Sequence, residues 1–138
     1  MDFTWKKLLV IVLIFVGIIV LPVFLCSSST MDYYQKRIDR EPNTNFNKWL
    51  QIASADVCYK TMRPELSAEY YRRFRDRYKD DPRRPYAFLR YAKSLEDCGR
   101  NADAIEEYKR YMEEYPERED SKEAFNGIDR IKYVKPVK

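Results

Sequence analysis

Paired carboxylates come closest to a catalytic pattern in this chain of 138 residues. Glu106-Glu107 and Glu113-Glu114 have the side chains of a general acid and a general base. They alternate with Lys and Arg at helical spacing, which is typical of a solvent-facing helix held by i,i+3 and i,i+4 ion pairs. Since no nucleophile has a neighbouring base in the sequence, we predict that the protein is not an enzyme.

Composition excludes several kinds of site. The chain has no histidine, which excludes His-based metal sites and Ser-His-Asp triads. Its three glycines are too few for a phosphate-binding loop. Cys26, Cys58 and Cys98 form no C-x-x-C pair and no zinc spacing, so we expect no metal and no cofactor. Cys58 and Cys98 form either a disulfide or two small buried thiols, and both alternatives stay open.

Charge is distributed unevenly along the chain. Residues 63–90 contain nine Lys and Arg against five Asp and Glu, a net charge of +4, whereas residues 103–123 contain four against nine, a net charge of −5. These stretches are either solvated helix faces or docking patches for partners of opposite charge. The candidate basic patch consists of Arg72, Arg73, Arg75, Arg77, Arg83 and Arg84. Anionic lipid headgroups are a possible ligand for it.

An uncharged run of 18 residues, Leu8–Leu25, dominates the N-terminus. As a helix it would be about 27 Å long, close to the ~30 Å of a bilayer core. Lys6 and Lys7 precede it, and Trp5 stands where an interfacial aromatic would. We therefore predict a membrane anchor over residues 1–26, with the N-terminus cytoplasmic and the remaining chain extracytoplasmic (periplasmic). This location argues against nucleic acid as a partner.

Two other fates of the N-terminus are compatible with the sequence. A signal peptide could be cleaved at the small residues Cys26-Ser27-Ser28-Ser29. A lipoprotein would instead be cut before Cys26 and acylated there, although Leu25 is larger than that processing favours.

The remaining sequence is typical of successive α-helices. Apolar residues recur at three- and four-residue spacing from Phe46 onward, and Pro64, Pro116 and Gly99 fall at boundaries. We expect a neck over residues 27–44 with a helical part at 31–40, a helical domain over 45–132 and a tail over 133–138. The expected helices of the domain cover residues 45–61, 64–79, 85–97, 101–115 (or from 103) and 119–132.

The same spacing predicts which side chains face the core. The expected core residues are Phe46, Trp49, Ile52, Ala53, Val57, Tyr70, Tyr71, Phe74, Tyr78, Phe88, Leu89, Tyr91, Ala92, Leu95, Ala104, Ile105, Tyr108, Tyr111, Met112, Ala124, Phe125, Ile128 and Ile131.

A period of 34 residues links two of these helices. Phe74 precedes Tyr108 by 34 residues, and Pro82 precedes Pro116 by the same number. Paired helices at this period are the pattern of the tetratricopeptide repeat. The residues of 85–116 that match its positions are Phe88, Tyr91, Ala92, Leu95, Gly99, Ala104, Tyr108 and Pro116. The segment therefore resembles a tetratricopeptide unit.

The preceding unit, residues 51–82, departs from the family pattern. Tyr70 replaces a small residue, Ser54 replaces an aromatic and Pro64 shortens the turn, so the resemblance is weaker at the first helix pair. The sequence of residues 71–82 and 85–116 is also similar to that of bacterial envelope proteins with such repeats, of the barrel-assembly lipoprotein and Tol–Pal-associated types.

The resemblance implies an all-α fold, in which a short stack of antiparallel helical hairpins follows the single transmembrane helix. In such stacks the first helix of each pair lines a binding groove. The groove residues it implies here are Ile52, Ala55, Tyr59, Tyr86, Leu89, Arg90 and Lys93, with Arg90 and Lys93 placed to bind an acidic or C-terminal carboxylate. The neck or the last helix could instead fill this groove.

These observations predict a non-catalytic, membrane-anchored scaffold that binds protein partners on the extracytoplasmic face. The expected partners are membrane lipid and other subunits of a larger complex, respiratory, photosynthetic or secretory, of which this chain would be an accessory or assembly subunit. The alternative is an exported envelope-biogenesis adaptor, cleaved or lipid-anchored at Cys26.

Overall fold

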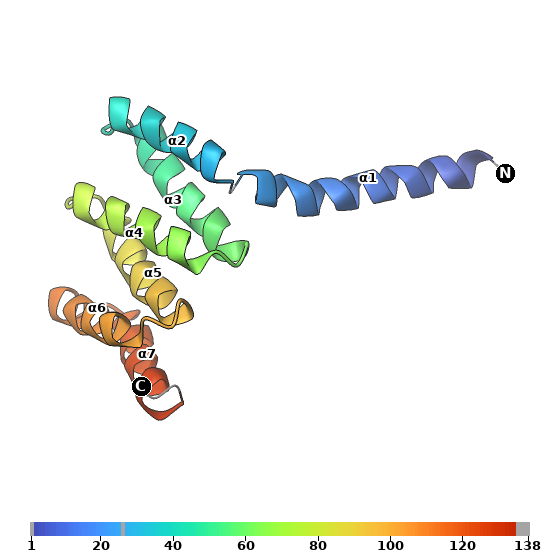
Figure 1. The fold of residues 1–138 in the computed structure, drawn as a ribbon. Coiled ribbons are helices and arrows are strands. Elements are labelled where there is room, and N and C mark those ends of the chain that lie inside the picture. Colours follow the sequence, from blue (N-terminus) through green and yellow to red (C-terminus); the bar gives the residue numbers. More distant parts are fainter. Residues whose placement is uncertain (1, 26, 135–138) are drawn as a thin grey trace.

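The computed structural model describes residues 2–25 and 27–134 (Figure 1). These residues form helices and no strands, which confirms the predicted all-α fold class. The predicted processing at Cys26 and the tail residues 135–138 lie outside the described residues. The helices are α1 (Asp2–Leu25), α2 (Ser28–Arg40), α3 (Asn45–Lys60), α4 (Pro64–Arg77), α5 (Arg84–Asp97), α6 (Asn101–Glu114) and α7 (Ser121–Tyr133).

Local sequence explains where α3 begins and where α3 and α5 end. The Thr44 side chain accepts a hydrogen bond from the Asn47 amide (3.2 Å) and caps the first turn of α3. Beyond each helix one residue adopts a left-handed conformation: Met62 (φ 59°) after α3 and Gly99 (φ 75°) after α5. The amides of Met62 and Gly99 and of the residues that follow them donate back to the last helical turn, at 2.9–3.2 Å.

From α2 to α7, each helix packs against the next one in the sequence, and α4 and α5 share the most extensive interface. Helix α5 also contacts α7. Figure 1 shows this stack as a succession of hairpins, with α1 extending away from it. The architecture is thus nearly one-dimensional, with an open surface at each end.

Aromatic side chains form most of the core between the helices. The largest are fully buried: Tyr71 and Phe74 on α4, Phe88 on α5, and Tyr108 and Tyr111 on α6. Their rings meet at close range, as in the perpendicular pair of Phe88 and Tyr111 with centroids 5.6 Å apart. All five were predicted as core residues, and the structure confirms them.

For three residues the prediction of burial in the core is wrong. Phe46 and Trp49 on α3 are 54% and 56% exposed, and Phe125 on α7 is 56% exposed. Phe125 lies on α7, the last helix of the stack, and Phe46 and Trp49 lie on α3, which α2 covers much less than α4 does. Their spacing identified the apolar side of each helix correctly, but no neighbouring helix covers it.

The predicted location as a single-pass membrane protein is also wrong. In the part of the chain that the structure describes, no helix is both long and apolar enough to cross a bilayer. The predicted transmembrane helix is therefore wrong, and so is the prediction that a membrane separates the N-terminus from the helical stack.

Candidate functional site

The residues predicted to line a groove lie on α3 and α5. Tyr86, Arg90 and Lys93 recur at helical spacing along one side of α5, next to Tyr59 of α3. These four side chains are exposed or half-buried, whereas Leu89 is 7% exposed and belongs to the core. We call the surface formed by Asp56, Tyr59, Tyr86, Arg90 and Lys93 the α3–α5 face.

Two tyrosine rings hold Arg90 in place on this face. The guanidinium carbon lies 5.6 Å from the ring centroid of Tyr59 and 5.4 Å from that of Tyr86, within the range of cation–π contacts. Tyr59 lies on α3 and Tyr86 on α5, so Arg90 bridges these two helices at the surface. A side chain restrained in this way loses less conformational entropy when it binds a ligand.

The carboxylates of this region are already engaged by tyrosine hydroxyls. Asp56 accepts hydrogen bonds from Tyr71 and, at 2.8 Å, from Tyr86. Burial, together with a hydrogen bond to Asp97, raises the pKa of Tyr59 to about 12, so its hydroxyl stays protonated at neutral pH. Both carboxylates therefore accept hydrogen bonds from tyrosine hydroxyls rather than pairing with the cations of the face.

Arg90 and Lys93 consequently have no ion pair with any carboxylate among the described residues. Two carboxylates interact with these cations electrostatically without an ion pair: Glu123 of α7 with Arg90, and Glu96 of α5 with Lys93. The α3–α5 face thus presents two cations, one helical turn apart, whose charges no neighbouring carboxylate neutralises at contact distance.

The arginines of the predicted basic patch are in a different situation, because each of the six lies within ion-pair distance of a carboxylate. Arg75 is buried, and its guanidinium donates to Glu107 at 2.5 Å and to Asp76 at 2.8 Å. Arg84 pairs with Glu114 and also donates to the Tyr115 hydroxyl at 2.5 Å. The other four pairs are Arg72 and Arg73 with Glu69, Arg77 with Asp39, and Arg83 with Asp81.

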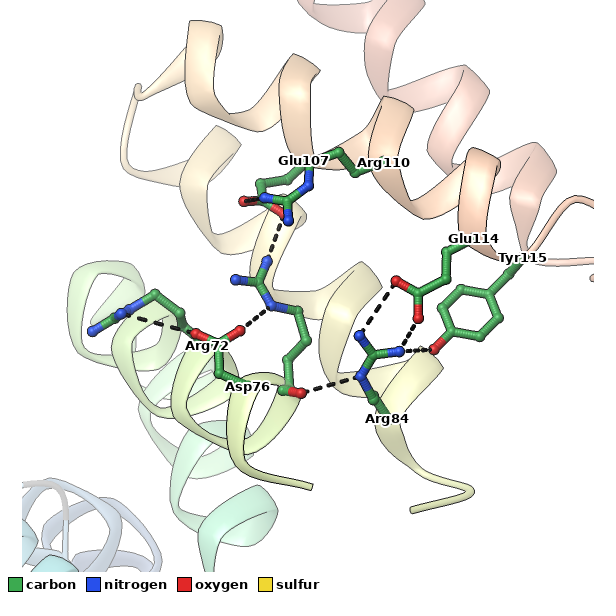
Figure 2. A network of polar contacts seen from close by, with 8 residues as sticks. Arg72, Asp76, Arg84, Glu107, Arg110, Glu114 and Tyr115 are labelled. Atoms are coloured by element: carbon green, nitrogen blue, oxygen red, sulfur yellow. Dashed lines mark hydrogen bonds and ion pairs between the residues drawn. The ribbon is translucent and has the colours of Figure 1, made fainter. Parts of the chain in front are cut away.

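Figure 2 shows how the two oppositely charged stretches of the sequence meet. Glu107 and Glu114 come from the acidic stretch on α6, and their arginine partners come from the basic stretch on α4 and α5. Part of the charge asymmetry along the sequence is therefore neutralised within the stack.

The residues assigned to the predicted anchor lie on α1. Trp5 is 73% exposed, and Lys6 and Lys7 are exposed as well. The two described cysteines are thiols, Cys58 buried and Cys98 half-buried. Burial raises the pKa of the Cys98 thiol, which disfavours the reactive thiolate.

Sequence reasoning missed an apolar groove between α2 and α3, of about 380 Å³. Three large aromatic side chains on it are more than half exposed: Tyr33 (64%), Phe46 and Trp49. The signal was the apolar stripe of α3, which we assigned to the core. We call this surface the α2–α3 groove; its lining residues are Met31, Tyr33, Tyr34, Arg37, Phe46, Trp49, Leu50, Ala53, Ser54 and Val57.

No protein-family model matches this chain, and no curated protein sequence matches it at a significant level. Within residues 2–25 and 27–134, no group of three or more His, Cys, Asp or Glu side chains is placed to hold a metal ion.

Proposed function

We propose that this chain is a non-catalytic helical scaffold of the tetratricopeptide-repeat type that binds an acidic segment of a protein partner on the α3–α5 face. The observation that carries the proposal is the contrast between two sets of cations. The six arginines of the basic patch are neutralised by carboxylates of the chain itself, whereas Arg90 and Lys93 are not. A carboxylate from a binding partner is the group that would form ion pairs with Arg90 and Lys93.

The two tyrosines beside Arg90 support a peptide ligand. Tyr59 and Tyr86 present ring surface beside Arg90, which suits contact with the side chains of an extended segment. A peptide binds here without displacing any internal ion pair of Arg90 or Lys93.

Support for the repeat type comes from two features together. The 34-residue spacing of Phe74 and Tyr108 places two fully buried aromatics at matching positions of α4 and α6. Antiparallel neighbours stacked at that period are the usual arrangement of such repeats. A stack of this length leaves both ends open, which favours a role as an accessory or assembly subunit within a larger complex.

The test is co-purification from the native source with a tagged full chain. Wild type should retain a partner at fixed stoichiometry, and R90E/K93E should lose it because both cations become anions. K109E is the matched control, since Lys109 is exposed on α6 and lies outside the face. The proposal fails if R90E/K93E retains the same partner as wild type, or if wild type purifies alone as a monomer.

A further inference from the structure

We propose that the α2–α3 groove is a second binding site, which takes the apolar face of an amphipathic α-helix from a protein partner, with a carboxylate of that helix paired to Arg37. The site uses different side chains from the α3–α5 face, so it stands independently of the function proposed above. Helix-in-groove binding needs a groove whose apolar lining residues recur at helical spacing and whose surface no other helix of the chain covers. It also needs a polar group that fixes the orientation of the bound helix.

The channel is present. On α3 the lining positions Phe46, Leu50, Ala53 and Val57 recur every three or four residues and form one continuous stripe. Met31 and Tyr34 of α2 form the opposite wall at the same spacing. Two stripes of this kind are the two walls that an anchored helix contacts with its own residues at i, i+3, i+4 and i+7.

Tyr33, Phe46 and Trp49 are exposed aromatic side chains of the groove, whereas Tyr34 packs against the core. The ring centroids of Phe46 and Trp49 lie 5.9 Å apart, and those of Tyr33 and Tyr34 lie 6.1 Å apart. Each pair leaves more than half of at least one ring in water. Exposed aromatics gathered at the edge of an apolar groove are typical of interaction sites, because covering them releases water from apolar surface.

The repeat itself shows that a packing partner is missing. Positions 34 residues beyond Ala53 and Val57 are Ala87 and Tyr91 on α5, with exposures of 0% and 8%. Ala53 and Val57 are only half-buried. The difference arises because α4 packs extensively along α5, whereas α2 covers α3 much less. This side of α3 is therefore less covered than the matching side of α5.

Charge decides what kind of helix fits. Among the described residues that line the groove, Arg37 is the only charged one, and its guanidinium carbon lies 5.3 Å from the Phe46 ring centroid. Arg37 forms no ion pair with a carboxylate of the described residues. A partner helix with Asp or Glu beside its apolar face satisfies this cation. The apolar segment Leu8–Ile18 of α1 does not, because it contains no carboxylate; this argues against α1 of a second copy as the occupant.

The test uses two synthetic helical peptides with identical leucine faces, one flanked by glutamates and the other by lysines. Trp49 reports binding in a full chain that carries W5F, which removes the other tryptophan. The Leu/Glu peptide should shift the Trp49 emission to the blue and bind about tenfold more tightly than the Leu/Lys peptide.

Substitutions at exposed positions then identify the contacts. R37E should abolish or reverse the preference for the Leu/Glu peptide, a result that a merely destabilised fold would not produce. R40E is the matched control, because Arg40 is exposed on α2 but does not line the groove. R90E/K93E should retain peptide binding, which separates this proposal from the function of the α3–α5 face.

Three results would overturn the proposal. The first is an absence of any Trp49 shift with either peptide. The second is equal binding of the two peptides that R37E leaves unchanged. The third is self-association of the full chain in sedimentation that A53E abolishes, because the occupant would then be a second copy.

Discussion

Replacing Arg130 by Met should destabilise the protein strongly, because it leaves a buried carboxylate without its cation. Arg130 on α7 donates two hydrogen bonds to Glu96 on α5, at 2.6 and 2.7 Å. The Tyr108 hydroxyl on α6 donates a third, at 3.0 Å. The Glu96 side chain is 1% exposed, so water cannot replace what Arg130 provides.

The magnitude follows from the burial of the two partners. Breaking a fully buried ion pair costs about 3–5 kcal/mol, but the Arg130 side chain is 37% exposed and part of its charge is screened. We therefore expect R130M to lose about 2–3 kcal/mol of unfolding free energy, with a fall in Tm of about 10 °C. E96Q should cost less, about 1 kcal/mol, because Arg130 can then turn toward water.

Urea unfolding of the full chain, followed by far-UV circular dichroism, measures these values for R130M, E96Q and the double variant. The double variant should be more stable than R130M, since the uncompensated charge is gone. Burial favours a higher pKa for Glu96, but the hydrogen bonds from Arg130 and Tyr108 outweigh it and hold the pKa below its usual range. The R130M penalty should therefore shrink as Glu96 is protonated at acidic pH. The reasoning would be refuted if R130M lost less than about 0.5 kcal/mol of unfolding free energy. It would also be refuted if the loss in the double variant equalled the sum of the losses in E96Q and R130M.

Three further predictions can be measured by the same unfolding assay. G127A should lose about 1 kcal/mol or more, because its Cβ would lie 2.5 Å from a ring carbon of the fully buried Tyr108 and overpacking outweighs the better helix propensity of Ala; a gain in stability would contradict the close approach. M62G should gain about 0.5–1 kcal/mol, because Met62 is 88% exposed in a left-handed conformation that strains any residue with a Cβ; an unchanged or lower stability would show that no strain is relieved there. The free energy of unfolding should fall below about pH 4.5, because hydrogen bonds from Arg83 and Arg118 lower the pKa of Asp81 and Asp120 in the folded state. Their stabilisation is present above the pKa of the unfolded state and is lost as the pH falls through the pKa of the folded state. A urea midpoint that does not change between pH 6 and pH 3 would argue against this prediction.

Helix positions were predictable because their signals are local. Thr44 caps α3 one residue before the predicted start, and the prolines of the first turns mark where α4 and α5 begin. The buried aromatics of α4 and α6 were predictable from their spacing as well. Phe46, Trp49 and Phe125 were not, since periodicity identifies the apolar side of a helix but contains no information on whether another helix covers it.

The polar cross-links could not be predicted for a related reason. Arg75 and Glu107 are 32 residues apart, and Glu96 and Arg130 are 34 apart, so their pairing depends on how the hairpins stack. From the sequence, Arg75 belonged to a basic patch and Glu107 to a pair of surface carboxylates. Arg90 and Lys93 share one side of a single helix, which local spacing does predict, and their binding role stays a prediction.

The nearest-neighbour packing of the stack has a consequence for its dynamics. A helix held on two sides opens less often than one held on a single side. Amide protons of α4 and α5 should therefore exchange with solvent last, and those of α2 should exchange early, as the terminal hairpins fray. Local unfolding would therefore begin at the two ends of the stack and proceed inward. A ligand that binds a terminal helix would also slow the unfolding of the helices packed behind it.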